Sequence, residues 1–378
     1  MSERLPRRAY LGAELPGDNE AFTTDGVRIA AVIDNTMAAR AGLRAGDVMV
    51  SLAARSLHDL RELAAALRAA GHATTTELVY LRDGARHTAT VDVEALPQAS
   101  CESYGELAVD GARLRTIATH ADSARALVLV IQGIACESVD CALDRDAPLA
   151  VLVDGLTRAG YDTLRFDKRG VGDSEGSACN ATDFHTELAD ARAVLDYARR
   201  LGVPLVLFGH SVGGIIATQL ADAAAAIAVF GTPVMRWLDC LLDSTERQLR
   251  MRGASDADIA QQLAAIRDLA RAGELNGRCA AYHEQLHALD LEAAWRAVDV
   301  PVLVLRGEHD WVVRADDQAR IAELARGSTT IVDLPGLDHL FGAHEDRAAS
   351  LRNYGAASAD HSVVDATVAW LDGLRLRL

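Results

Sequence analysis

Basic residues are few relative to acidic ones in this 378-residue chain. Lysine and arginine together number 38, against 54 aspartates and glutamates, and the formal net charge is −16. A surface with this balance repels phosphate backbones and anionic membrane surfaces. The composition therefore argues against nucleic acid as a partner.

Long apolar runs and paired cysteine motifs are also lacking. The first eight residues carry charge with no apolar stretch behind them, and no later run is long enough to span a bilayer. The six cysteines have no C-x-x-C spacing, which is typical of reduced thiols and not of a disulfide framework or a zinc site. We therefore expect a soluble, cytoplasmic protein with no membrane span and no metal. The cysteines are Cys101, Cys136, Cys141, Cys179, Cys240 and Cys279.

A dinucleotide-binding loop is missing as well. Gly170 and Gly172 lie close together, but no third glycine follows at the offset that such a loop needs. The sequence therefore predicts no cofactor.

The length of the chain and its N-terminal pattern indicate two domains. A chain of 378 residues is long for one domain, and each of two would be large enough to bury its own core. Residues 8–97 predict short strands around a helix over 58–70, with a hairpin turn at Asp83 and Gly84. We expect a small α+β domain over 8–97 and a linker over 98–105.

The segment from Ala38 to Asp47 makes the first domain more specific. Its Ala-Ala-x-Ala-Gly-Leu-x-x-Gly-Asp order resembles PDZ domains of the bacterial protease-associated type. Such domains hold an extended peptide by strand addition, and backbone N–H groups bind its terminal carboxylate. The resemblance implies this role for Leu11, Gly12 and Ala13, with a peptide C-terminus as the partner. The alternative is a module that only packs against the other domain or mediates dimerisation.

From residue 106 onward, strand patterns alternate with helix patterns. This alternation is typical of a mostly parallel sheet that is covered on both faces. Between about 234 and 297 the alternation stops, and the patterns there are helical. We expect an α/β domain over 106–378 with an all-helical insertion over about 234–297.

The most informative motif is Gly209-His210-Ser211-Val212-Gly213. It follows the buried-strand pattern 203–208 and precedes the helix pattern 215–220. A G-x-S-x-G at a strand-to-helix turn is a nucleophile elbow, whose glycines permit a sharp turn that leaves the serine hydroxyl exposed above the sheet. Ser211 is therefore the predicted nucleophile of an acyl-transfer reaction.

A serine nucleophile needs a base, and the base needs an acid that orients it. Asp310 lies in the loop after the strand pattern 302–306, and His339 lies in a loop further along the chain. With Ser211 they resemble the α/β-hydrolase family in chain order, which is nucleophile, then acid, then base. Less well placed rivals lie nearby: Glu308, Asp316, Asp338, His309 and His344.

Two backbone N–H groups are the predicted oxyanion donors. The Val212 N–H lies at the start of the helix after the nucleophile, where the helix dipole assists it. The second donor is Ile134, in the loop Gln132-Gly133-Ile134 that follows the strand pattern 127–131.

These motifs, in this order, resemble the α/β-hydrolase superfamily over residues 104–378. The resemblance implies an α/β-hydrolase fold with a lid. It also implies a serine esterase or thioesterase that forms an acyl-enzyme with an acyl small molecule or a carrier- or peptide-linked substrate. A peptidase, an acyltransferase or a cyclase would use the same triad. The remaining alternative is a non-catalytic ligand-binding scaffold, favoured by Gln132 in place of the usual histidine of the superfamily.

Overall fold

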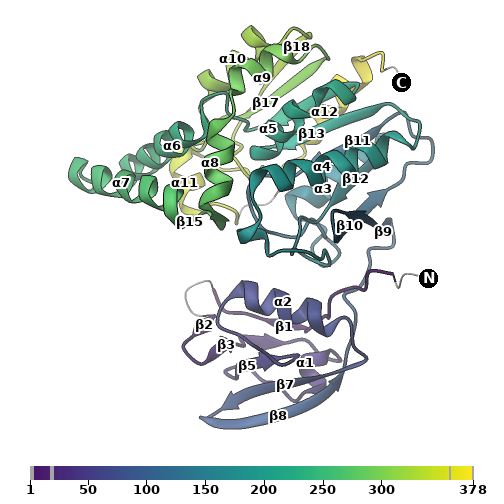
Figure 1. Cartoon of the computed structure of the whole chain (residues 1–378), viewed down its shortest axis with the longest axis vertical. Helices are drawn as coiled ribbons and strands as arrows, with labels where there is room; N and C mark the ends of the chain where they lie inside the picture. The colour runs from purple at the N-terminus through teal and green to yellow at the C-terminus, as the bar shows by residue number, and fades with distance from the viewer. Residues whose placement is uncertain (1–3, 18–20, 357–358, 377–378) are drawn as a thin grey trace. The chain divides into compact units, whose positions relative to one another are not determined.

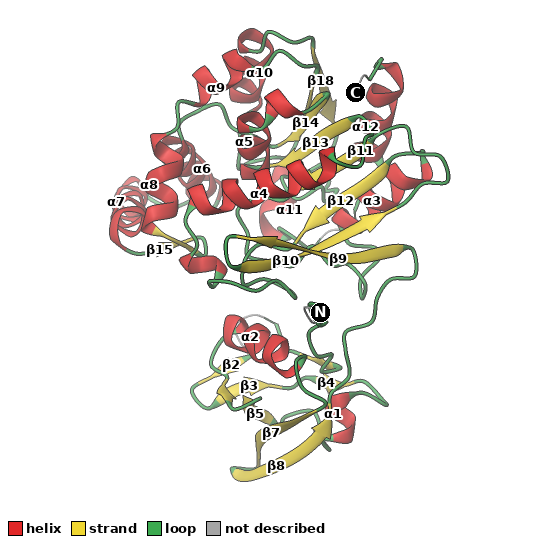
Figure 2. Cartoon of the chain, turned by 45° about the vertical axis from the view of Figure 1, so that its right-hand side comes forward, coloured by secondary structure: helices red, strands yellow, loops and turns green. Residues whose placement is uncertain are grey.

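The computed structural model describes residues 4–17, 21–356 and 359–376. Contacts divide the chain into two compact units, one made of Met1–Gln98 with Gly170–Glu175 and the other of Ala99–Arg169 with Gly176–Leu378. Figures 1 and 2 label the helices and strands of each unit.

In its described residues, the first unit contains a six-stranded sheet, a separate strand pair and two helices. Its elements are β1 Ala13–Glu14, β2 Phe22–Thr23, β3 Gly26–Arg28, β4 Ala31–Val32, α1 Met37–Arg40, β5 Val48–Leu52, β6 Arg55–Ser56, α2 Leu60–Ala70, β7 Thr75–Arg82 and β8 Ala85–Asp92. The sheet order is β2-β3-β5-β7-β8 with β6 paired to β5, and β1 pairs with β4. The core of this unit includes the fully buried side chains of Val27, Met37, Met49, Leu52 and Leu78.

Local chemistry accounts for α2 and for the β7–β8 hairpin. The Asp59 carboxylate accepts a hydrogen bond from the Glu62 N–H and caps the start of the helix. Asp83 and Gly84 have φ angles of +51° and +76°, the left-handed pair of a two-residue hairpin turn. The helix and the turn that the sequence predicts are both confirmed.

The second unit is built on an eight-stranded sheet. Its strands are β9 Glu102–Val109, β10 Ala112–Thr119, β11 Leu127–Ile131, β12 Asp162–Phe166, β13 Leu205–His210, β14 Ala226–Phe230, β17 Val302–Gly307 and β18 Thr329–Leu334. They lie in the order β18-β17-β14-β13-β11-β12-β10-β9, parallel from β18 to β12 and antiparallel at β10 and β9. Because parallel strands end at the same edge, the loops after β11, β13, β14, β17 and β18 meet there.

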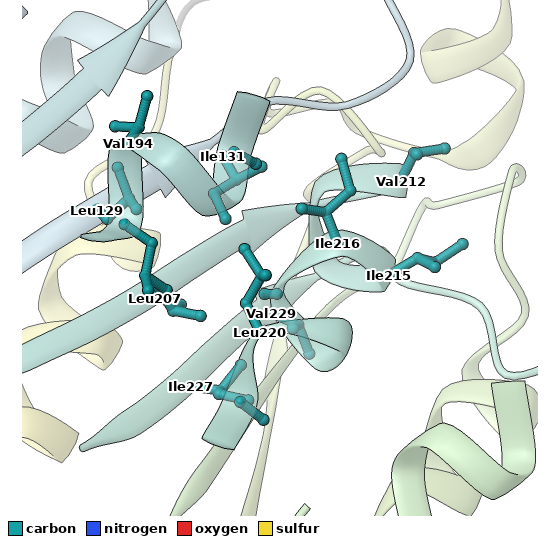
Figure 3. Packing of buried hydrophobic residues seen from close by; sticks show 14 of the residues in the cluster. Leu129, Ile131, Val194, Leu207, Val212, Ile215, Ile216, Leu220, Ile227 and Val229 are labelled. Atoms are coloured by element: carbon teal, nitrogen blue, oxygen red, sulfur yellow. The ribbon is translucent and has the colours of Figure 1, made fainter. Parts of the chain in front are cut away.

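Helices cover both faces of this sheet. The helical segments of this unit outside the stretch between β14 and β17 are α3 Pro148–Arg158, the short 3-10 helices η1 Cys179–Ala181 and η2 Ala221–Ala223, α4 Phe184–Arg199, α5 Val212–Gln219, α10 Ala315–Leu324, α11 Arg347–Arg352 and α12 Ser362–Gly373. One buried cluster joins α4 and α5 to the sheet, and a second joins α3 and α12. Figure 3 shows the first cluster, with side chains of β11, β13 and β14 packed against α5. The predicted α/β fold with a mostly parallel sheet is confirmed.

The segment between β14 and β17 departs from the prediction in one place. It consists of α6 Trp237–Met251, α7 Asp256–Ala272, β15 Glu274–Leu275, β16 Arg278–Cys279, α8 Ala280–Ala288 and α9 Leu291–Ala297. The prediction of an all-helical insertion is wrong at the β15–β16 hairpin. Asn276 and Gly277 have φ angles of +49° and +70°, which reverse the chain in a tight turn. The helices α6, α7 and α8 lie side by side (Figures 1 and 2).

Candidate active site

Ser211 lies at a sharp turn between β13 and α5. Its φ of +54° is in the left-handed region, which is uncommon for a residue with a side chain. The flanking glycines are required by space, because a Cβ on Gly209 would lie 2.4 Å from the backbone of α5. A Cβ on Gly213 would lie 2.1 Å from the Ile131 carbonyl oxygen. The chain therefore makes the strand-to-helix turn that the motif predicts.

Asp310 and His339 form a buried pair at the same edge of the sheet. His339 Nδ1 lies 2.9 Å from Asp310 Oδ2, and the two side chains are 5% and 1% exposed. Asp310 Oδ1 accepts hydrogen bonds from the N–H groups of Val312 and Val313 at 2.7 and 2.9 Å. Because the carboxylate accepts, Nδ1 carries the proton, and Nε2 of the neutral imidazole keeps a lone pair for a proton.

The loop after β14 brings Ser211 close to this pair. A Cβ on Gly231 would lie 2.7 Å from His339 Nδ1 and 3.2 Å from Asp310 Oδ2. The next residue, Thr232, donates from Oγ1 to the Ser211 carbonyl oxygen at 3.1 Å. Among the described residues, no hydrogen bond joins Ser211 Oγ to the imidazole, a contact that often tightens only with bound substrate.

Gly231→Ala is expected to lower kcat by about 10²-fold, because the new methyl group would displace the His339 ring. Steady-state kinetics on an ester substrate measures this. Gly253→Ala is the matched control, since Gly253 also has a left-handed φ, +75°, but has nothing within 4 Å of its would-be Cβ. Equal losses of kcat in the two variants would contradict the assigned position of the imidazole.

The rival acids have other partners. Asp338 Oδ2 lies 2.9 Å from His344 Nε2, and Asp338 Oδ1 accepts from two backbone N–H groups of its own loop. This second pair therefore shapes the loop that carries His339. Glu308 accepts from a backbone N–H at 2.9 Å, and Asp316 pairs with an exposed arginine.

His210, the residue before Ser211, contacts the backbone of the predicted base. Its Nε2 lies 2.8 Å from the His339 carbonyl oxygen, and a carbonyl only accepts, so Nε2 carries the proton. Burial, with the nearby His339 adding to it, lowers the pKa of His210 to about 3. His210 is therefore neutral at pH 7 and holds the backbone of His339. The G-x-S-x-G motif gives no signal for this, because its second position is unrestricted.

The predicted oxyanion donors lie on adjoining segments. A Cβ on Gly133 would lie 3.3 Å from Ser211 Cβ, so the loop after β11 passes beside the serine. Val212 is the first residue of α5, where an N–H has no acceptor within the helix. In the described part of the chain, neither the Val212 nor the Ile134 N–H donates a hydrogen bond. Two such N–H groups beside a serine are what an oxyanion hole requires.

Gln132 opens the loop that carries Ile134. Its side-chain Nε2 is buried and has no hydrogen-bond partner among the described residues. This atom therefore does not brace the oxyanion loop, and other side chains hold it.

Cys136 and Cys179 form a disulfide, with Cα atoms 5.8 Å apart. The prediction that all six cysteines are reduced thiols is wrong for this pair. Spacing gives no sign of it, because the two residues are 43 apart in sequence and meet only through the fold. The other four cysteines, Cys101, Cys141, Cys240 and Cys279, are free.

Reduction of the Cys136–Cys179 disulfide is expected to lower the free energy of unfolding by about 4 kcal/mol, because a cross-link over 43 residues restricts the unfolded chain. Urea unfolding with and without reductant measures the loss. Alkylation under denaturing, non-reducing conditions should label four of the six cysteines, and all six after reduction. Six labels without reductant would show that the bond is absent.

The predicted peptide-binding residues lie at the start of β1. The carbonyl groups of Leu11 and Gly12 accept from backbone N–H groups of the same unit at 2.8 and 2.9 Å. Gly12 has a φ of +72°, and a Cβ there would lie 2.2 Å from Thr36, so only glycine fits. Ala13 pairs with Val32. The peptide-binding role of these residues stays a prediction.

In residues 4–17, 21–356 and 359–376, no three or more His, Cys, Asp or Glu side chains are grouped so as to hold a metal ion. Within the same ranges, no helix combines the length and apolar character needed to cross a bilayer.

A mostly parallel sheet with an elbow at Ser211, and with the Asp310–His339 pair on later loops, defines an α/β hydrolase. Residues 122–345 match the family described as serine aminopeptidase, S33, over more than half of the chain. The chain belongs to this family of hydrolases. Residues 9–93 match the PDZ domain, so both predicted resemblances are confirmed.

One individual protein and two solved structures that this chain is similar to are each less than 30% identical to it. A protein of Haemophilus influenzae described as "Probable periplasmic serine protease do/HhoA-like" is 29% identical over 106 residues, which cover 28% of this chain and 23% of that protein. This chain thus spans under a quarter of that relative's length. Est1E from Butyrivibrio proteoclasticus, solved with ferulic acid bound, has a TM-score of 0.49 and 18% identity over 70% of this chain and 97% of its own. Epoxide hydrolase A from Mycobacterium thermoresistibile has a TM-score of 0.46 and 20% identity over 73% of this chain and 100% of its own.

Proposed function

We propose that this hydrolase is a serine esterase or thioesterase that forms an acyl-enzyme on Ser211. The observation that carries the proposal is the buried Asp310–His339 pair, packed on the Gly231 loop next to the serine. A hydrogen-bonded acid and imidazole beside an elbow serine activate a hydroxyl that is otherwise a weak nucleophile.

The proposed reaction has two halves. Ser211 Oγ attacks the acyl carbonyl carbon while His339 Nε2 takes its proton, and Asp310 stabilises the resulting imidazolium. The N–H groups of Val212 and Ile134 hold the oxyanion of the tetrahedral intermediate. His339 then gives the proton to the leaving alkoxide or thiolate. In the second half, water attacks the acyl-enzyme with His339 again as the base, and the acid product and free Ser211 are released.

Intact-mass analysis after exposure to a fluorophosphonate tests the proposal directly. Such a probe phosphonylates an activated serine with loss of fluoride. We expect one adduct on the wild type and none on Ser211→Ala. Absence of an adduct on the folded wild type, or the same adduct on both proteins, would refute the assignment of Ser211.

A second candidate is a peptidase that uses the same residues. The family description, serine aminopeptidase, favours it, and the PDZ match adds a module of a kind that binds peptides. Parallel assays on p-nitrophenyl esters and on aminoacyl p-nitroanilides separate the two functions. Faster Ser211-dependent turnover of the anilides would favour the peptidase over the esterase.

We also propose that the PDZ domain binds a peptide C-terminus at Leu11, Gly12 and Ala13 and so helps to recruit a substrate or partner. Isothermal titration calorimetry with peptides that end in a free carboxylate measures such binding. Amidation of the peptide terminus is expected to abolish it, because backbone N–H groups would hold the carboxylate. Equal binding of the amidated peptides would contradict this proposal.

We also propose that the protein is cytoplasmic. The expectation of a cytoplasmic location depends in part on reduced thiols, and the Cys136–Cys179 bond removes that part of the argument. Trapping of thiols before cell lysis, followed by fractionation, tests it. A cytoplasmic fraction with the bond intact would keep the proposal, whereas recovery in an extracytoplasmic fraction would refute it.

A further inference from the structure

We propose that Lys168 is a positioning residue for the oxyanion hole, and that it aims the Ile134 N–H through the peptide bond that precedes it. This inference rests on the proposed serine hydrolase function. Lys168 follows the end of β12 and is 4% exposed, on the same sheet edge as the serine turn.

The argument begins with one peptide unit. The Gly133 carbonyl oxygen and the Ile134 N–H belong to the same planar trans unit, so they point in opposite directions. Lys168 Nζ donates to the Gly133 oxygen, and to the Ala135 oxygen at 3.1 Å. A bond that fixes the direction of the Gly133 oxygen therefore also fixes the direction of the Ile134 N–H. Ser211 lies against the same glycine.

Arg278, from the β15–β16 hairpin, holds the next carbonyl of the loop. Its Nε donates to the Ile134 oxygen at 2.9 Å, and its Nη1 donates to the Cys179 oxygen at 2.9 Å. Cys179 is also bonded to Cys136, two residues after Ile134. Three successive carbonyl groups of the loop thus accept from two buried cations, and a disulfide closes the segment.

Glu187 on α4 partly compensates these cations. Its Oε1 lies 3.0 Å from Lys168 Nζ, and its Oε2 pairs with Arg278. One carboxylate shared between two cations leaves positive charge facing the loop carbonyls. Hydrogen bonds from charged donors are stronger than neutral ones, and they polarise the peptide so that its N–H becomes a better donor.

The environment of Lys168 predicts that kcat depends on pH through the charge of its amine. Burial lowers the pKa of Lys168 to about 8, although Glu187 opposes this shift. The amine is therefore charged at pH 7, and it becomes a weaker neutral donor as the pH rises through 8. The charged and titratable groups that face it or lie nearby are Glu187, Arg278, Glu137, Arg169, Asp190 and His210.

The test compares Lys168→Met, Lys168→Arg and Arg169→Met on a p-nitrophenyl ester, with Ser211→Ala in the same series. We expect Lys168→Met to lower kcat about 10²-fold, close to the effect of removing one oxyanion donor outright. KM should stay within about threefold of the wild type. Binding of a trifluoromethyl ketone, which forms an oxyanion on the serine, should weaken by the same factor. Lys168→Arg should recover most of kcat and lose the alkaline limb near pH 8, because a guanidinium stays charged.

Arg169→Met is the matched control. Arg169 is the neighbouring buried cation and pairs with Asp190 on the same helix α4 at 2.7 Å, but it donates to no carbonyl of the oxyanion loop. We expect it to lower the melting temperature without the loss in kcat.

The other possible outcomes refute either the role of Lys168 or the proposed hydrolase function. A folded Lys168→Met variant with wild-type kcat, or a loss equal to that of Arg169→Met, would overturn the role of Lys168 while Ser211-dependent turnover stands. If Lys168→Met does not fold, the Lys168→Arg profile decides, and an unchanged alkaline limb overturns the proposal. Absence of any Ser211-dependent turnover or adduct refutes the proposed function, and the inference with it.

Discussion

Ser211→Ala is expected to lower kcat for ester hydrolysis by about 10⁶-fold and to leave the fold intact. The loss is large because the variant has no atom that can form the acyl-enzyme, so the residual rate comes only from water attack in a site that still holds the oxyanion donors. The hydroxyl makes no hydrogen bond to the imidazole among the described residues, so its removal breaks no such bond. Steady-state kinetics together with circular dichroism measures both parts.

Ser244→Ala is the matched control for this variant. Ser244 and Ser211 are both 8% exposed, but the Ser244 hydroxyl donates to a carbonyl within α6. We expect its kcat to stay within about twofold of the wild type, since a lost local hydrogen bond of this kind costs about 1 kcal/mol of stability and touches no reacting group. Turnover by Ser211→Ala at the rate of Ser244→Ala would remove the case for acyl-enzyme chemistry.

Asp310→Asn is expected to lower kcat by about 10⁴-fold with little change in KM. The amide nitrogen of asparagine donates where the carboxylate oxygen accepts, so the imidazole is pushed toward the tautomer with its proton on Nε2. That tautomer cannot take a proton from Ser211. The rate of fluorophosphonate labelling should fall in parallel, because it also depends on the activated hydroxyl.

Glu308→Gln provides the comparison for Asp310→Asn. Glu308 is an acid on the same loop, two residues away, but its Oε2 accepts from the Gly336 N–H and lies in an exposed contact. We expect its kcat to stay within about threefold of the wild type. If Glu308→Gln caused the larger loss, the identity of the orienting acid would have to be revised.

Much of the candidate site could be read from the sequence, because its requirements are local. The elbow needs glycines at fixed offsets from Ser211, since a Cβ at either one would collide with backbone within 2.4 Å. The order of Ser211, Asp310 and His339 follows the order of the strands whose loops carry them. Likewise the α/β class follows from alternating strand and helix patterns, which are short-range periodicities.

Two other features could not be predicted from local sequence patterns. The β15–β16 hairpin depends on two residues in a left-handed turn, inside a segment whose overall pattern is helical. The tautomer and neutrality of His210 depend on burial and on a carbonyl 129 residues away. Neither leaves a pattern that spacing or periodicity could reveal.

The sequence by itself determined the α/β architecture, the PDZ module and the turn at Ser211, because each is set by side-chain size and polarity at short range. Only the tertiary structure decided how the oxyanion loop is held. Lys168, Arg278 and Glu187 come from the loop after β12, from β16 and from α4, and Cys136 bonds to Cys179 across 43 residues. Contacts of this kind exist only after the sheet has brought its loops to one edge, and no local pattern in the chain encodes them.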